Sequence, residues 1–247
     1  MRVQTEPARR PELLLCDVGD TLIEWTGYDR DAGLDALVPL IDRRERYDRA
    51  LLAREGELLD HDWEERAATS LLEFRQCDFL RTLFGAHGMR LLCSDDSLET
   101  LYWRSALTFQ PESGVGDALE RISAAGVRLG IISNTVFGPD AIACELASHR
   151  LLDRFDGPII TSARYGIRKP LPSIFRAALG LYDGEESTTW YVGNSVYHDV
   201  GGAHAAKLTA VWYNGDNEDI ELTVGDPPDL TVFSWDELAR EIESLGG

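Results

Sequence analysis

Five polar residues in this sequence are of types that can act together on an anionic substrate. They are Asp17, Ser133, Asn134, Lys169 and Asp199. A carboxylate such as Asp17 can attack an electrophilic phosphorus or carbon atom and form a covalent intermediate. A serine hydroxyl and backbone N–H groups can hold the oxygens of an anion, while a lysine neutralises developing charge. Asp17 and Asp199 together can bind one Mg²⁺, which takes few protein carboxylates and keeps several waters.

Each of these residues also has an ordinary structural explanation. An aspartate at the end of a strand often caps a turn, and Ser133 and Asn134 are typical helix-capping types. Lys169, before two prolines, suits a solvated loop, and Asp199 suits the first turn of a helix. The functional interpretation therefore depends on whether the fold brings the five residues to one place.

Short apolar runs in the chain predict buried strands that position these residues. The runs cover residues 13–16, 127–132, 158–160, 190–192 and 210–213. The later runs each follow a segment with helical spacing of apolar residues, which indicates successive βα units and a parallel sheet with right-handed crossovers. Ligands of such sheets bind beyond the carboxyl ends of the strands. Asp17, Ser133 and Asn134 come directly after such runs, and we expect them to meet Lys169 and Asp199 at one sheet edge.

A long segment after the first strand needs a separate explanation. Between that strand and Gln110 lie about 85 residues rich in Leu, Ala, Glu and Arg, far more than a crossover helix requires. We expect this segment to be helical throughout and to form an inserted all-α subdomain over residues 23–109, leaving 1–22 and 110–247 as the core. The acidic stretch 215–221 is expected to be a solvated loop.

The composition limits the class of protein. The chain has 247 residues, 44% of them hydrophobic, which is enough for a large core. Its formal net charge of −19 disfavours binding to nucleic acid or to an anionic membrane, although a locally positive pocket can still bind a small anion. The four cysteines form no CxxC pair, and the N-terminal residues lack the apolar run of a signal peptide. We expect a cytoplasmic protein and leave its oligomeric state open.

Four segments resemble the ordered motifs of the haloacid dehalogenase superfamily of hydrolases: CDVGDTL (16–22), GIISNT (130–135), GIRKPLPSIF (166–175) and YVGNSVYHDVGGAHAA (191–206). The resemblance implies a Rossmann-like core with an α-helical cap inserted after the first motif. It also implies Mg²⁺ as cofactor and a role for each matching residue. Asp17 resembles the nucleophile, Ser133 the phosphate-binding hydroxyl with Asn134 beside it, Lys169 the lysine of the third motif, and Asp199 a metal-binding carboxylate.

Two positions depart from the family pattern. Phosphatases of the family usually carry a second aspartate, the general acid and base, two residues after the nucleophile, where this chain has Gly19. The Gly19 carbonyl can still bind a metal ion but cannot transfer a proton, and Asp20 is either a shifted replacement or a cap for the turn. Asn194 stands where many members have an aspartate, and the lost charge should weaken Mg²⁺ binding.

Three functions remain open at this point. The leading hypothesis is a Mg²⁺-dependent phosphatase that acts on a small phosphorylated metabolite through an aspartyl-phosphate. The alternative is a carbon–halogen hydrolase of the 2-haloacid dehalogenase type, which needs neither a metal ion nor an acid, although dehalogenases typically place an aromatic residue at the position of Gly19. The third is a catalytically weakened member that binds a phosphorylated ligand or a protein partner.

Overall fold

A six-stranded parallel sheet forms the core of the protein. The computed structural model describes residues 9–215 and 227–245. The spatial order of the strands is β5 (Ile159–Thr161), β4 (Arg128–Ser133), β1 (Leu13–Cys16), β6 (Thr189–Gly193), β7 (Thr209–Tyr213) and β8 (Leu230–Val232). Every neighbouring pair is parallel. The prediction of an α/β fold with a Rossmann-like parallel sheet is confirmed.

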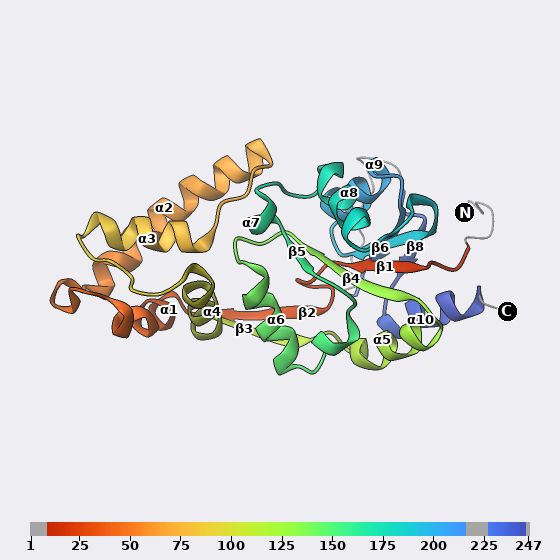
Figure 1. Ribbon diagram of the computed structural model, residues 1–247, viewed down its shortest axis with the longest axis horizontal. Helices are drawn as coiled ribbons and strands as arrows, with labels where there is room; N and C mark the ends of the chain where they lie inside the picture. The colour runs from red at the N-terminus through yellow and green to blue at the C-terminus, as the bar shows by residue number, and fades with distance from the viewer. Residues whose placement is uncertain (1–8, 216–226, 246–247) are drawn as a thin grey trace.

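Helices cover both faces of this sheet, as Figure 1 shows for α8 and α9 on one side and α5 and α10 on the other. Leu13 and Leu15 of β1 pack in one apolar cluster with residues of α8 (Pro172–Leu181) and α9 (Gly201–Ala205). Leu14 and Cys16 pack in a second cluster with residues of α5 (Val115–Ala124), α6 (Pro139–Ser148) and α10 (Trp235–Ser244). Successive side chains of a strand point to opposite faces, so a strand covered on both sides must be apolar throughout. This requirement explains why the apolar run LLLC (13–16) correctly predicts the buried strand β1.

Four helices make up most of the inserted segment: α1 (Arg30–Leu37), α2 (Arg49–Ser70), α3 (Gln76–Ala86) and α4 (Asp95–Ala106). In Figure 1 they lie at the end of the molecule opposite the two termini. The longest of them, α2, is capped by Asp48, whose side chain accepts a hydrogen bond from the Leu51 N–H and so satisfies a free donor of the first turn. A short helix, α7 (Ser162–Tyr165), follows β5 on the core side.

The two ends of the inserted segment are strands, so the prediction of helix throughout residues 23–109 is wrong there. β2 (Ile23–Tyr28) and β3 (Leu107–Pro111) pair antiparallel, with an irregularity between Trp25 and Gly27. Aromatic and β-branched residues favour an extended backbone in both segments. Because about 80 residues separate the partners, the pairing is a tertiary effect that local helical spacing does not reveal.

The order of the strands fixes where the functional edge lies. β1 stands between β4 and β6, with Cys16 beside both Ile131 and Val192. After β1 the core strands β4 and β5 add on one side of it, and the chain then returns to add β6 and β7 on the other side. The carboxyl end of β1 is therefore a topological switch point. Asp17, Ser133 and the residues after Gly193 therefore meet at one edge.

The solvated loop expected at the acidic stretch 215–221 is not tested, because residues 216–221 lie outside the described residues. No helix in the described parts of the chain is long and apolar enough to cross a membrane.

Candidate active site

Lys169 joins two carboxylates at the carboxyl edge of the sheet. Its Nζ atom donates hydrogen bonds to Oδ1 of Asp17 at 2.7 Å and to Oδ1 of Asp199 at 2.6 Å. The side chains of Lys169 and Asp199 are 2% and 1% exposed, and that of Asp17 is 11% exposed. Because ion pairs in a buried site are only weakly screened by solvent, this arrangement couples the charges of all three groups.

Burial and neighbouring charge shift the pKa values in this cluster. Burial raises the pKa of Asp17 to about 6, against the lowering effect of Lys169, and the negative charge of Asp199 adds to the increase. Burial alone would lower the pKa of Lys169, but Asp17 and Asp199 outweigh it and hold that pKa above its usual value. Lys169 is therefore a fixed positive charge beside a carboxylate that ionises near neutral pH.

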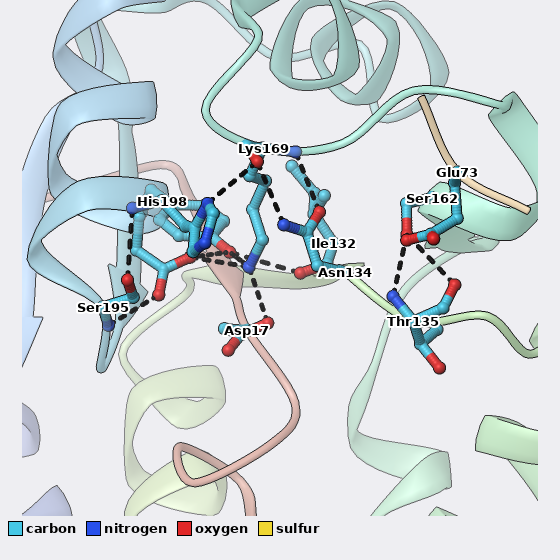
Figure 2. Close-up of polar contacts among 11 residues, drawn as sticks. Asp17, Glu73, Ile132, Asn134, Thr135, Ser162, Lys169, Ser195 and His198 are labelled. Carbon is cyan, nitrogen blue, oxygen red and sulfur yellow. Dashed lines mark hydrogen bonds and ion pairs between the residues drawn. The ribbon is translucent and has the colours of Figure 1, made fainter. Parts of the chain in front are cut away.

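The backbone of Lys169 is held from two sides, as Figure 2 shows. The Asn134 amide donates to the Lys169 carbonyl at 3.1 Å and accepts from the Lys169 N–H at 2.8 Å. Nδ1 of His198 lies 3.0 Å from the same carbonyl oxygen, and burial lowers the pKa of His198. Both ends of the Asn134 side-chain amide thus help to position Lys169, and the assignment of Asn134 to the phosphate-binding groups stays a prediction.

Asp199 is fixed by the turn that carries it. Its Oδ2 accepts a hydrogen bond from the Ser195 N–H at 2.9 Å, and the hydroxyl of Tyr191 donates to Oδ1 at 3.2 Å. A side-chain carbon at Gly193 would lie 2.4 Å from the Asp199 carboxyl carbon, so only glycine allows this close approach. Tyr191 also lies 2.8 Å from Nζ of Lys169. Tyr191 was not predicted from the sequence. The feature that could have indicated its role is a hydroxyl group within a strand that is buried on both faces.

Ser133 and Gly19 line a common cavity, which Val18, the residue after Asp17, also borders. Ser133 ends β4 and is 4% exposed. A side-chain carbon built at Gly19 would have no atom within 4 Å. The structure thus leaves open space at Gly19, the position at which the family resemblance implies a second aspartate.

Asp20 and Asn194 lie to one side of this cavity and border a second, polar depression. Oδ1 of Asp20 accepts a hydrogen bond from the Trp25 N–H at 3.2 Å, so its side chain stabilises the turn into β2. The carbonyl of Asn194 accepts a bond from Nε1 of Trp212 at 2.9 Å. The bond of Asp20 to the Trp25 N–H agrees with the second of the two roles expected for Asp20, a cap for the turn.

The donors at the sheet edge agree in type with a magnesium site. Within the described residues, no group of three or more His, Cys, Asp or Glu side chains could hold a metal ion. Two carboxylates, Asp17 and Asp199, share the Lys169 ammonium group, and Mg²⁺ is commonly held by one or two carboxylates together with waters and substrate oxygens. Both oxygens of Asp199 already accept hydrogen bonds, which predicts weak binding.

A contact from the helical segment reaches the loop after Ser133 and was not anticipated. Glu73 accepts a hydrogen bond of 2.7 Å from the Ser162 hydroxyl, which in turn accepts one of 2.8 Å from the Thr135 N–H (Figure 2). Burial raises the pKa of Glu73, against the effects of Ser162 and Arg168. The backbone adds bonds from the Glu73 N–H to the Gly166 carbonyl and from the Arg168 N–H to the Leu71 carbonyl. The helical segment is thereby fixed against the second and third motifs.

The order of the strands, the inserted segment and the Asp–Lys–Asp cluster agree with a match of residues 14–207 to the haloacid dehalogenase-like hydrolases. The chain belongs to this family. The expected resemblance is thus confirmed, and the protein is a haloacid dehalogenase-like hydrolase.

Two curated relatives bear the same name, glyceraldehyde 3-phosphate phosphatase. The protein of Pyrococcus abyssi is 31% identical over 100 residues, which cover 40% of this chain and 41% of the relative. The protein of Pyrococcus furiosus is 26% identical over 148 residues, covering 59% and 60%. In both cases the similarity spans less than two thirds of the relative.

Solved structures of this family share the fold over nearly the whole chain. A 2-haloacid dehalogenase from Pseudomonas syringae pv. Tomato DC3000 has a TM-score of 0.64 and 22% identity, covering 95% of this chain and 99% of the other. The HAD-hydrolase YfnB from Bacillus subtilis, bound to magnesium, has a TM-score of 0.56 and 20% identity, covering 95% and 99%. At these identities the likeness concerns the fold.

Proposed function

We propose that this haloacid dehalogenase-like hydrolase is a Mg²⁺-dependent phosphomonoesterase that acts on a small phosphorylated metabolite through an aspartyl-phosphate on Asp17. In this proposal residues 1–22 and 110–247 form the catalytic core, and residues 23–109 form a cap. The observation that carries it is the buried contact of Lys169 with both Asp17 and Asp199. A lysine so placed offsets the charge of the nucleophile and of the transferring group.

In the first step, Asp17 attacks the phosphorus atom of the substrate. Its Oδ1 is held by Lys169, which leaves Oδ2 as the attacking oxygen. A bond forms between this oxygen and phosphorus while the ester P–O bond breaks, and the leaving oxygen departs with the electron pair and is protonated by water. A second water then attacks phosphorus, releases inorganic phosphate and restores the Asp17 carboxylate.

The remaining residues hold the phosphoryl group and the cofactor. We assign the Ser133 hydroxyl, Asn134 and nearby backbone N–H groups to the phosphate oxygens, and the Asn134 side chain also positions Lys169. Asp17, the Gly19 carbonyl and Asp199 would hold Mg²⁺, with Asn194 and Asp20 near the site but contributing little. The ion would supply positive charge that binds phosphate oxygens and withdraws electron density from phosphorus.

The names of the two Pyrococcus relatives support a small phosphate ester as the class of substrate. A carbon–halogen hydrolase remains the second candidate, because Gly19 provides no acid and halide needs none. A third candidate is a weakened member that only binds its ligand, since both Gly19 and Asn194 lack the usual carboxylate.

The test separates these three functions in one experiment. Release of inorganic phosphate and of halide is measured on panels of phosphate monoesters and 2-haloacids, with and without EDTA. The proposal requires phosphate release that EDTA removes, whereas halide release that EDTA leaves unchanged would overturn it in favour of a dehalogenase. A ligand-dependent rise in melting temperature without any turnover would instead support the binding protein.

A further inference from the structure

A cavity at the loop that follows Asp17 is lined largely by apolar side chains, four of them aromatic. Its volume is about 200 Å³, and it is partly open to solvent, with Trp25 55% exposed. Gly19, two residues after Asp17, and Ser133, the last residue of β4, line it together with the aromatic side chains of Trp25, Trp103, Phe109 and Phe137. These residues come from the β2–β3 ribbon, from α4 and from the loop after β4, so both the inserted segment and the core contribute (Figure 1).

The aromatic walls present ring faces and edges because their polar atoms are already bonded. Nε1 of Trp103 donates to Glu145 at 2.8 Å, and Nε1 of Trp25 donates to the Gly27 carbonyl at 2.9 Å. The ring of Trp103 stacks on Phe109 at 4.8 Å and meets Phe137 edge-on at 4.8 Å. Such mutual packing fixes the rings and offers a ligand apolar contact with few hydrogen bonds.

The polar groups of the cavity gather at one end. None of the described residues that line it is charged, and its polar side chains are Ser133, Asn134 and Thr135, consecutive residues after β4. The Asn134 amide is engaged with Lys169, and the Thr135 hydroxyl accepts a bond from the Phe137 N–H at 3.2 Å. A polyol or a second charged group in the outer part would lose its hydration without gaining partners.

The volume sets the size of the group that fits. An apolar cavity of about 150 Å³ is sufficient for a benzene molecule. A cavity of about 200 Å³ therefore accepts a single ring with small substituents, while the phosphoryl group lies outside it, against Asp17 and Ser133.

The open space at Gly19 points independently to the same type of leaving group. No side chain at this position can protonate the departing oxygen. An alkoxide needs that proton because it is a strong base, whereas a phenol ionises with a pKa of about 10, as tyrosine does, and departs as a stable anion.

We propose, on the basis of the phosphatase function above, that the cavity selects phosphate monoesters of small uncharged aromatic alcohols. Asp17 forms its bond to phosphorus as the bond between phosphorus and the aryl oxygen breaks, and the aryloxide leaves with the electron pair and takes a proton from solvent water. The ring occupies the space between Trp25, Trp103, Phe109 and Phe137.

Binding of inert analogues tests the cavity without the influence of leaving-group reactivity. Competitive inhibition by phenylphosphonate is compared with inhibition by 2-hydroxyethylphosphonate in the wild type, and the phenyl compound should bind about tenfold or more tightly because its ring is buried. Phe109→Ala should reduce this ratio severalfold by removing a wall. Phe233→Ala, at a 49% exposed site away from the cavity, should preserve the ratio. Phe109→Leu keeps an apolar side chain and replaces Phe109→Ala in the test if the alanine variant fails to fold. It should also reduce the ratio of the affinities for the two phosphonates.

The same proteins are assayed with phenyl phosphate, glycerol phosphate and glyceraldehyde 3-phosphate. A higher kcat/KM for phenyl phosphate together with the analogue ratio supports the proposal. The cavity proposal is overturned if the two phosphonates bind equally, or if neither Phe109 variant changes the ratio of their affinities. The phosphatase function still stands in that case if glycerol phosphate or glyceraldehyde 3-phosphate is hydrolysed. Absence of hydrolysis of every phosphomonoester overturns both.

Discussion

The ammonium nitrogen of Lys169 lies 2.7 Å from Oδ1 of Asp17, and both side chains are largely shielded from water. With Asp199 on the same nitrogen, the cluster carries one positive and two negative charges when all three groups are ionised. A phosphate ester brings further negative charge to this place. Binding it beside a net negative cluster is unfavourable unless a cation is added, and this balance supports the magnesium proposal.

Substitution of Asp17 tests its proposed role as nucleophile. Asp17→Asn is nearly isosteric and should abolish turnover of any true substrate while the far-UV circular dichroism stays unchanged, because an amide oxygen is a poor nucleophile. Asp20→Asn is the matched control and should keep most of the activity, since Asp20 bonds to the Trp25 N–H. Retention of more than roughly a tenth of the wild-type rate in Asp17→Asn would remove Asp17 from the role.

Removal of the Lys169 charge should destabilise the fold. Lys169→Met leaves two carboxylates buried without their counter-ion, and loss of one partner of a buried pair typically lowers the free energy of unfolding by about 3–5 kcal/mol. Urea unfolding in metal-free buffer at pH 8 measures this effect. The added substitution Asp199→Asn should recover part of the loss, because it removes one of the two unpaired charges. If the changes in unfolding free energy caused by Lys169→Met and Asp199→Asn simply add in the double variant, Lys169 and Asp199 are not coupled.

The pH dependence of that loss follows from the pKa of Asp17. Burial already raises this pKa to about 6, and removal of Lys169 takes away the charge that lowers it. Because the pKa of Asp17 is raised in the folded protein, the free energy of unfolding falls as pH rises through this pKa. The fall should be larger in Lys169→Met, which lacks the charge that lowers the pKa of Asp17. The difference in unfolding free energy between wild type and Lys169→Met should therefore be smaller at pH 5 than at pH 8. An equal difference at the two pH values would contradict the coupling.

How far the sequence alone could predict this site depends on the kind of contact. The bounds of the five expected core strands differ from the predicted ones by at most one residue, because a continuous apolar run is typical of a strand buried on both faces. Asp17, Lys169 and Asp199 were predicted to meet, and they do. The pairing of β2 with β3, the place of Tyr191 and the bond from Ser162 to Glu73 were not predicted. Each depends on residues brought together only by tertiary packing, which leaves no local period in the sequence.

Glu73 should make the stability of the contact between the inserted segment and the core depend on pH. Burial raises its pKa in the folded protein, so its contribution to stability is greatest below its usual pKa of about 4.5 and decreases as pH rises through the folded value. Glu73→Gln removes this titration while keeping the shape and an acceptor for Ser162. Relative to wild type, the variant should gain stability in urea unfolding between pH 4 and pH 7. A constant difference would mean that Glu73 has no raised pKa.

Magnesium binding should depend on Asp199 and improve with a third carboxylate. Calorimetric titration of Mg²⁺ in the presence of inorganic phosphate should give weak binding in the wild type, none in Asp199→Ala and tighter binding in Asn194→Asp, because Mg²⁺ prefers charged oxygen ligands. Asp20→Ala is the control and should leave the titration unchanged, since its side chain holds the turn into β2. Undiminished binding in Asp199→Ala would place the ion elsewhere.

Gly19→Asp tests whether the missing acid limits the range of leaving groups. Nothing lies within 4 Å of a side-chain carbon at this position, so the variant should fold without displacing its neighbours. A positioned acid contributes roughly 10²–10⁴-fold to a rate, and the gain is largest where the leaving oxygen is most basic. The variant should therefore raise kcat/KM for an alkyl phosphate far more than for phenyl phosphate. Gly19→Asn is the matched control, because it fills the same space without a proton to donate and should give no such selective gain. If the wild type already hydrolyses alkyl phosphates rapidly and both variants behave alike, another group supplies the proton, and Asp20→Asn is the next variant to assay.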